Sequence, residues 1–306
     1  MTTVDETLFL ITHHFSPQQS IIKVPFSGAL NLFLAEDLLI PEQQIPTRNR
    51  TEKTNFAISE TIIAKGSLLR PYEIGILLKQ GIEEVMVYKP IHVSVQPVYT
   101  DRYAFKPIIA PLISNIFGNF EGVNTSEEKM LVINRDETPS RLETLLNQSD
   151  IIFFTGYDLE GTVPLLEQLG IKFIVKSIAQ QPGGSLMIGI NNSNNKAIFL
   201  LPPQQPGALL AAEVYGRLAL LQLRNKSLET LKATSATNYQ NKTQNTHFSI
   251  GRYSVFDKEI IVNFRQNVNE LTLTDFVNSN CYVKVLPQTN VEKSQTVEII
   301  PFMVQG

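Results

Sequence analysis

The sequence predicts an α/β protein with a mainly parallel central sheet and a small β-module at the end of the chain. Three observations predict this fold class. Apolar strand segments alternate with helical segments between residues 129 and 176, a long apolar helical segment covers 208–223, and short strand segments separated by turn residues fill 247–306. Alternating strands and helices indicate parallel strands joined by right-handed crossovers. Short strands between turns indicate a β-module.

Length and composition fit a globular protein of two or three modules. The chain has 306 residues, of which 43% are hydrophobic and 18% charged, so disorder of the whole chain is not expected. The net charge of −3 argues against a nucleic-acid partner. No segment reaches the roughly 18 to 20 apolar residues of a membrane span, and Asp5 and Glu6 stand where a signal peptide would carry basic residues. We therefore expect a cytoplasmic protein without a membrane partner.

Residues 1–90 predict a mixed module. Residues 29–39 carry apolar side chains at helical spacing before a proline-containing loop. Residues 71–80 predict a helix, because proline stands at its first position and Gly81 lies just past its end. Residues 84–88 follow as a strand.

The segment 129–176 predicts the parallel sheet of a central domain over 91–225. Its strands are expected at 129–134, 151–154 and 171–176, and its helices at 138–148 and 162–169. Thr138 is expected to cap the first helix, and the leucines of that helix fall on one face. The fully apolar run 151–154 is typical of a buried strand in a parallel sheet.

Two further strands and a long helix complete the central domain. Residues 185–190 and 196–201 flank a polar Asn-rich run, which predicts a hairpin. Residues 208–223 are apolar on nearly every face and predict a buried helix. The polar stretch 224–246 predicts a linker, and the β-module is expected over 245–306.

Three loops rich in glycine and proline form the candidate binding site, at 155–161, 180–184 and 202–207. Ligands of open parallel sheets bind beyond the carboxyl ends of the strands. Glycines permit close backbone approach, and amides at the start of a helix can bind an anion. Each loop could also be an ordinary solvated turn. If the three loops converge, their edge suits a phosphate-bearing ligand.

The chain offers few groups for side-chain chemistry. Asp158 and Glu160 in the first loop could hold a divalent metal or could simply be exposed. No Ser-His-Asp arrangement, P-loop or dinucleotide fingerprint is present. The single cysteine, Cys281, predicts a packed core residue, and no Cys/His cluster has zinc-site spacing.

Several segments resemble the molybdopterin molybdenumtransferase family, which includes MoeA and the E domain of gephyrin. Residues 29–37, ALNLFLAED, resemble its opening signature Ala-Leu-Gly-Arg-Val-Leu-Ala-Glu-Asp. Residues 45–57 stand at its motif Val-Pro-Pro-Phe-Asp-Asn-Ser-Ala-Met-Asp-Gly-Tyr-Ala, where Thr54 replaces the acidic residue. Residues 63–69 and 74–88 resemble the segments that follow a separate β-domain in the family, and that domain is expected to be missing here. Residues 273–287 resemble a C-terminal family segment, so the resemblance covers nearly the whole chain in order.

The family's site motifs fall on the predicted loops with many substitutions. Its Thr-Ser-Gly-Gly-Val-Ser-x-Gly loop corresponds to 154–161, and its Asp-Ser-Asn to 113–115. Its Lys-Pro-Gly-Lys-Pro motif falls on 178–182, where Ile178 and Gln181 replace both lysines. Its Leu-Pro-Gly-Asn-Pro motif resembles 201–206 with one residue inserted.

The resemblance implies a three-layer, molybdopterin-binding-like α/β domain with a mainly parallel sheet, an N-terminal linker module and a small C-terminal β-barrel-like domain. It also implies a homodimer that binds adenylylated molybdopterin and molybdate with Mg²⁺. Asp158 and Glu160 are the expected catalytic and metal-binding residues. The expected cofactor-binding residues are Ser114, Asn115, Thr155, Gly156, Gly161, Pro182, Gly183, Pro202, Pro206 and Gly207.

Two functions remain open at this point. The first is molybdate insertion into adenylylated molybdopterin by an altered mechanism, with Asp158 and Glu160 as substitute metal ligands. The second is a catalytically inert paralogue that acts as a dimeric scaffold or as a pterin-binding regulatory protein. The substituted acids and lysines indicate impaired or altered catalysis, because a charge-assisted phosphate contact contributes about 1.5 to 3 kcal/mol.

Overall fold

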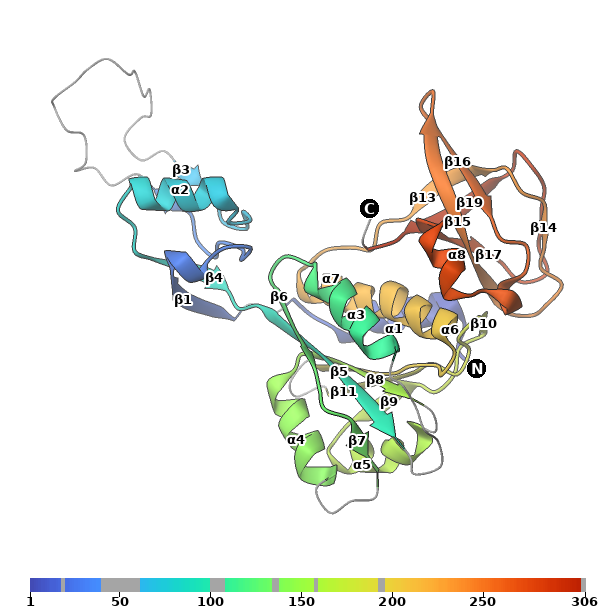
Figure 1. Ribbon diagram of the computed structural model, residues 1–306, viewed down its shortest axis with the longest axis horizontal. Helices are drawn as coiled ribbons and strands as arrows, with labels where there is room; N and C mark the ends of the chain where they lie inside the picture. The colour runs from blue at the N-terminus through green and yellow to red at the C-terminus, as the bar shows by residue number, and fades with distance from the viewer. Residues whose placement is uncertain are drawn as a thin grey trace. The chain divides into compact units, whose positions relative to one another are not determined.

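The computed structural model describes residues 1–17, 20–39, 61–99, 108–133, 138–156, 159–191 and 196–303, without the side chains of residues 99 and 160. The chain divides into two compact units. Unit 1 comprises Met1–Pro17, Ile91–Asn119 and Asn124–Gly306, and unit 2 comprises Gln18–Pro90 and Phe120–Val123. In Figure 1, unit 1 holds both the central sheet and a barrel near the C-terminus. None of the described helices is long and apolar enough to cross a membrane.

Unit 2 is a small mixed module. Strand β1 (Ile21–Pro25) pairs antiparallel with β4 (Glu84–Tyr88), and β2 (Leu38–Leu39) pairs with β3 (Thr61–Ile63). Helix α2 (Pro71–Lys79) and the short η1 (Phe26–Gly28) complete it. Its core includes Leu34, Leu69, Leu77, Val85 and Val87. Helix α2 and strand β4 confirm the predicted helix–strand unit.

The helical spacing of residues 29–39 does not produce a helix. Phe33 bridges Leu68 and Leu34 bridges Val87, so this segment joins its neighbours as extended chain. Asn31 has a φ of 62°, which a right-handed helix excludes. Long-range pairing therefore outweighs local periodicity here. The whole family-like segment 45–57 lies within residues 40–60, outside the described part of the chain. Leu39 and Thr61, which flank residues 40–60, pair with each other.

Unit 1 is built on a mixed sheet whose described strands have the order β6-β5-β8-β12-β11-β9, with β7 beside β5. The strands are β5 (Ile91–Tyr99), β6 (Val123–Glu127), β7 (Leu131–Val132), β8 (Ile151–Gly156), β9 (Lys172–Val175), β11 (Met187–Asn191) and β12 (Lys196–Leu200). Strand β5 is parallel to β7 and β8, and β8 to β12, whereas β11 is antiparallel to both β12 and β9. The predicted hairpin of β11 and β12 is confirmed.

The three strands predicted between 129 and 176 run in one direction but are not neighbours. Strand β5 lies between β7 and β8, and β12 and β11 lie between β8 and β9. The helix–strand alternation gives the common direction. It does not give the order, because strands from before and after this segment insert between its members.

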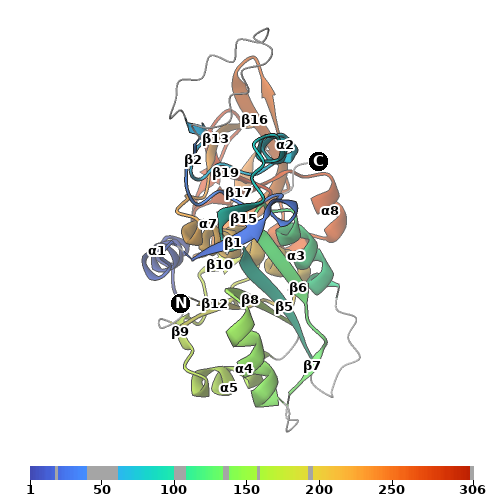
Figure 2. The same ribbon diagram turned by 90° about the vertical axis from the view of Figure 1, so that its left-hand side faces the viewer.

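Helices pack on both faces of this sheet (Figures 1 and 2). Helices α4 (Thr138–Gln148) and α5 (Val163–Gln168) cover one face, where α4 contributes Leu142, Leu145 and Leu146. On the other face, Phe153 of β8 packs between Phe117 and Phe199, with ring centroids 5.0 and 5.2 Å away. That face is covered by α3 (Ile109–Gly118) and by a central helix. The central helix consists of α6 (Gln205–Leu210), the π-helical η3 (Ala211–Gly216) and α7 (Arg217–Leu223).

Residues 1–17 belong to unit 1 and not to the predicted N-terminal module. Helix α1 (Val4–His14) packs against α7. The Thr2 amide donates to the Ser177 carbonyl at 3.0 Å, and Asp5 pairs with Lys284 at 2.8 Å. The first residues are therefore fixed by contacts distant in sequence, which the local pattern does not encode.

A closed barrel of five described strands forms the rest of unit 1. Its ring is β15 (Thr246–Phe256), β16 (Glu259–Phe264), β13 (Leu231–Ser235), β19 (Thr296–Pro301) and β17 (Cys281–Val285), which returns to β15. Strands β14 (Tyr239–Gln240) and β18 (Asn290–Val291) pair with each other, and α8 (Leu273–Val277) precedes β17. Cys281 is fully buried, as predicted, and burial raises the pKa of its thiol to about 12.

The predicted linker over 224–246 is wrong from Leu231 onward, because β13 and β14 belong to the β-structure. Its polar side chains are satisfied by hydrogen bonds within the fold. The buried Asn241 donates through Nδ2 to the carbonyls of Asn245 and Leu286 at 2.8 and 2.9 Å. A polar composition is therefore compatible with an ordered segment.

Candidate functional site

The candidate site lies at the carboxyl ends of the strands of the central sheet. Strands β5, β8 and β12 are parallel to one another. Because β11 is antiparallel to both β12 and β9, strand β9 runs in the same direction as these three strands. The loops that follow β8, β9 and β12 therefore leave the sheet at one edge. This arrangement agrees with the convergence expected from the sequence.

Two of the three predicted loops touch through their glycines. A Cβ added to Gly183 would lie 3.0 Å from the Cα of Gly207, and one added to Gly207 would lie 2.8 Å from the Cα of Gly183. Gly183 also has a φ of +84°, which disfavours any other residue. The loops 180–184 and 202–207 are thus held together by close backbone packing that requires glycine on both sides.

Gln180 and Gln181 lie in the loop after β9, where they form β10 and pair with β15 of the barrel. The buried Gln180 accepts a hydrogen bond from the Tyr215 hydroxyl and donates to the Pro182 carbonyl at 3.1 Å. Gln181 donates to the side chain of Asn269, in η4 (Val268–Glu270). Burial raises the pKa of Tyr215, so its hydroxyl remains a donor. The side-chain amides of both glutamines are therefore engaged in hydrogen bonds within the fold.

The end of β8 carries the strongest indication of a ligand. Gly156 has a φ of +142°, and a Cβ there would lie 2.3 Å from the Val98 carbonyl oxygen, so only glycine fits. Thr155 is 2% exposed, and its Oγ1 has no hydrogen-bond partner in the described part of the chain. A buried hydroxyl without a partner is unfavourable by about 1 to 3 kcal/mol. Among the residues that the structure describes, none therefore occupies the Thr155 hydroxyl at the predicted edge.

The expected acidic residues fall outside what the structure describes. This applies to Asp158 and to the side chain of Glu160, so their roles in catalysis and metal binding remain predictions. Among the described residues, no group of three His, Cys, Asp or Glu side chains could hold a metal ion. Gly161 lies nearby in η2 (Leu159–Thr162), where a Cβ would make only an ordinary contact with Ile133 at 3.6 Å.

The other predicted binding residues differ in exposure. Pro202 is buried, whereas Pro182, which follows a cis peptide bond, and Pro206 in the first turn of α6 are half-buried. Ser114 and Asn115 lie within α3, where Asn115 is exposed and donates through Nδ2 to the Pro111 carbonyl at 2.7 Å. The Asn115 amide is therefore occupied within its own helix.

The described loops lack the cations that a phosphate would need. Residues 177–184 and 201–207 contain no lysine, arginine or histidine. Backbone amides and Thr155 can hydrogen-bond a neutral heterocycle, but they do not neutralise a phosphate in the way a lysine or arginine does. The described loops thus offer neutral hydrogen-bonding groups but no positive charge.

Sequence reasoning did not find two buried ionisable side chains in the central helix, Glu213 and Arg217. Glu213 accepts a hydrogen bond from the Met303 amide at 2.9 Å, and Arg217 donates to the Pro301 carbonyl at 2.8 Å. Burial raises the pKa of Glu213 and lowers that of Arg217. The available sequence signal for this pair was an acidic and a basic residue four positions apart in an otherwise apolar helix. The pair attaches the last barrel strand to the central helix.

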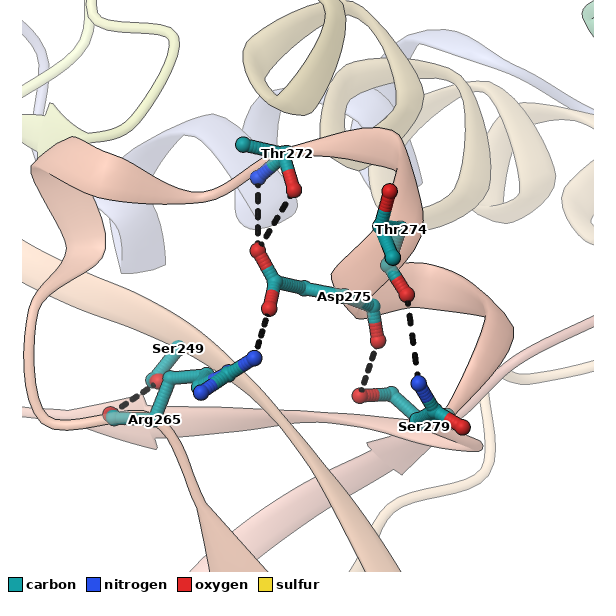
Figure 3. Close-up of polar contacts among 7 residues, drawn as sticks. Ser249, Arg265, Thr272, Thr274, Asp275 and Ser279 are labelled. Carbon is teal, nitrogen blue, oxygen red and sulfur yellow. Dashed lines mark hydrogen bonds and ion pairs between the residues drawn. The ribbon is translucent and has the colours of Figure 1, made fainter.

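A cleft of about 420 Å³ lies in the barrel, lined by Phe264, Arg265, Gln266, Asn267, Glu270, Leu271 and Asp275. Figure 3 shows that Asp275 accepts from the amide and hydroxyl of Thr272, at 2.9 and 2.8 Å, and pairs with Arg265. Hydrogen bonds from Thr272, and then Arg265, hold the pKa of Asp275 below its ordinary value. Because these contacts form the capping box of α8, we interpret them as structural.

No family model matches the chain, and no curated protein matches its sequence. Solved structures match it over its full length. A molybdenum cofactor biosynthesis protein from Pyrococcus furiosus is 16% identical, with a TM-score of 0.67 over 99% of this chain and 100% of that one. The molybdopterin biosynthesis MoeA protein of Pyrococcus horikoshii OT3 is 13% identical, with a TM-score of 0.69 over 99% of this chain and 100% of that one. A further Pyrococcus MoeA structure is 15% identical, with a TM-score of 0.69 over 100% of both chains. The resemblance to MoeA is therefore confirmed in the fold: this chain is folded as the MoeA molybdopterin biosynthesis proteins are.

Proposed function

We propose that this protein takes part in molybdenum cofactor biosynthesis by binding a molybdopterin-type pterin at the carboxyl edge of its central sheet. The full-length likeness to molybdopterin biosynthesis proteins supports the pathway. The observation that carries the site is the Thr155 hydroxyl, which has no hydrogen-bond partner among the described residues and lies on the same sheet edge as the packed loops of Gly183 and Gly207.

The described residues suit recognition of the ring more than of the phosphate. A pterin ring presents several hydrogen-bond donors and acceptors along its edge, which backbone amides, carbonyls and a threonine hydroxyl can match. The family's two lysine positions are Ile178 and Gln181 here, and the Gln181 side chain is bonded to Asn269. We therefore expect weaker binding of phosphate than a lysine-bearing site would give.

Transfer of molybdate into adenylylated molybdopterin is the finer form of this proposal. Hydrolysis of the adenylate would use Mg²⁺, for which Asp158 and Glu160 are the candidate ligands. The described residues contain no alternative group of three metal ligands. We therefore assign no step of the reaction to a particular side chain.

The second candidate is a catalytically inert, dimeric pterin-binding or scaffold protein. The replacement of both family lysines, one of them by a glutamine that contacts the barrel, favours it. An inert descendant retains the fold while its charged side chains change, because backbone contacts hold the loops.

Calorimetric titration of the full chain with molybdopterin and with its adenylate, with and without Mg²⁺, tests these alternatives. We expect binding, and we expect Thr155→Val to weaken it about tenfold through loss of one hydrogen bond. Thr12→Val, which changes an exposed threonine of α1, is the matched control and should bind normally. Absence of binding at high ligand concentration would contradict pterin recognition.

Molybdate-dependent release of AMP separates the two functions. Release with Mg²⁺ would establish a transferase and exclude inertness. Binding without release would establish the inert, pterin-binding alternative. Light scattering should show a dimer, and a monomer would contradict the dimeric scaffold.

A further inference from the structure

A second polar cleft lies on the opposite face of the sheet from Thr155. Its lining residues are Gln96, Glu128, Ser140, Arg141, Thr144, Leu145 and Gln148, and its volume is about 180 Å³. Gln96 pairs with Phe154, the residue before Thr155, so the two side chains leave opposite faces. A cleft of this volume suits a small metabolite.

Gln96 supplies a fixed acceptor to this cleft. The residue is 3% exposed, and its Nε2 donates to the carbonyls of Pro97 and Lys129 at 2.7 and 3.0 Å. Because the amide nitrogen is occupied by two carbonyls, the Oε1 atom is the group left for a ligand. An acceptor of this kind requires a donor from whatever binds.

Glu128 supplies a second acceptor, which carries a negative charge. Its Oε1 accepts from the Ser126 hydroxyl at 2.7 Å. Ser126 is itself held by Ser94 at 2.9 Å and by the His92 ring at 3.2 Å. The carboxylate is thus oriented by a chain of polar side chains on β5 and β6. Its Oε2 atom has no partner in the described part of the chain.

Arg141 supplies the positive charge. Its Nη2 donates to the Lys129 carbonyl at 2.7 Å, and its Nη1 to the Met130 carbonyl at 3.3 Å. These bonds fix the plane of the guanidinium and leave Nε and further Nη protons as donors, since arginine has five. Lys129 therefore joins Arg141 and Gln96 through one shared carbonyl.

We propose that this cleft binds a small zwitterion of the α-amino acid class. The carboxylate of the ligand binds Arg141, and its ammonium binds Glu128 and the Oε1 of Gln96. Both charges of the cleft are fixed before the ligand arrives, so little side-chain ordering opposes binding. A simple anion would also meet Glu128, and a simple cation would also meet Arg141. The cleft thus selects a ligand that carries both charges.

The test is calorimetric titration of the full chain with glycine, L-serine and L-glutamine, and with acetate and methylammonium as single-charge probes. We expect saturable binding of at least one amino acid and at least tenfold weaker binding of both single-charge probes. Arg141→Gln and Glu128→Gln should each weaken the amino acid at least tenfold. Glu143→Gln makes the same chemical change at an exposed position of α4 and should leave the affinity unchanged.

Three outcomes would overturn the proposal: no saturable binding of any amino acid, equal binding of acetate, or equal weakening by Glu143→Gln. If Arg141→Gln does not fold, as judged by circular dichroism, Glu128→Gln decides, because its amide oxygen can still accept from Ser126. Ser126→Ala tests whether Ser126 positions Glu128. It should weaken binding although Ser126 itself does not contact the ligand. Pterin binding plays no part in these measurements, so this proposal stands or falls separately from the proposed function.

Discussion

The carboxyl edge of the central sheet and the cleft beside α4 are built in different ways. At the edge, two loops are held by backbone contact between Gly183 and Gly207, and the nearby glutamines are occupied within the fold. In the cleft, Gln96, Glu128 and Arg141 are separately aimed by hydrogen bonds. A site held by its backbone keeps its shape while side chains change. A backbone-held site is thus compatible with a fold that is shared at 13 to 16% sequence identity.

The largest effect is expected where a substitution breaks the backbone contact. Gly183→Ala and Gly170→Ala form a matched pair, because their φ angles are +84° and +85°. Only at Gly183 would the new Cβ meet a neighbouring backbone within 4 Å. We expect Gly170→Ala to lower the free energy of unfolding by about 1 kcal/mol through strain. Gly183→Ala should lower it by about 3 kcal/mol through strain and overpacking together.

Urea unfolding of both variants gives the two free energies, provided that the slopes match that of the native chain. Equal destabilisation by the two substitutions would show that the loops do not touch at Gly183. Adding Gly207→Ala to Gly183→Ala sharpens the result. Two residues in contact should give a non-additive double variant.

A smaller effect, visible only as a change with pH, is expected for the buried Glu213. Its pKa is raised in the folded protein, so the folded state holds a proton that the unfolded state has lost above about pH 4.3. The stability of the native chain should therefore fall as pH rises from that value. Glu213→Gln removes this dependence and should become more stable relative to the native chain with rising pH.

The comparison is made from unfolding curves at pH 4 to 8. Glu143→Gln, at an exposed position, is the control for the loss of one carboxylate. A constant difference between Glu213→Gln and the native chain across this range would refute a raised pKa. Glycine contacts such as Gly183–Gly207 contain no titrating group. Their contribution to the free energy of unfolding should therefore not change with pH, whereas that of Glu213 should.

Local signals predicted the elements that local interactions decide. Helix α4 has the predicted bounds because Pro139 and its leucines lie within one short segment. The predicted cap is wrong, because Thr138 is the first helical residue and its hydroxyl donates to the Val132 carbonyl at 3.1 Å. Strand β8 extends two residues past its predicted end. The segment 29–39 and the strands within 224–246 were misjudged, since their pairing partners lie elsewhere in the chain. The order of the central strands was missed for the same reason.

The convergence of the candidate loops was predictable from the sequence, but their contacts were not. Loops that follow parallel strands must leave at one edge, which the sequence pattern is enough to indicate. The contact between Gly183 and Gly207 depends on how two loops approach in space. The cleft beside α4 joins Gln96, Glu128 and Arg141, which no sequence motif connects.

The smallest effect on stability, and the most informative one, is expected for Thr155→Val. Valine has nearly the shape of threonine, and the Thr155 hydroxyl has no partner among the described residues. Removing an unpaired buried hydroxyl should leave the free energy of unfolding unchanged or raise it by about 1 kcal/mol. A structural threonine would behave in the opposite way, because its replacement would break a hydrogen bond and destabilise the fold. Both the unfolding curve and the pterin titration should therefore be measured on the Thr155→Val variant. Unchanged stability with weaker binding identifies Thr155 as a ligand contact. Lost stability would show instead that the Thr155 hydroxyl is hydrogen-bonded within the protein itself.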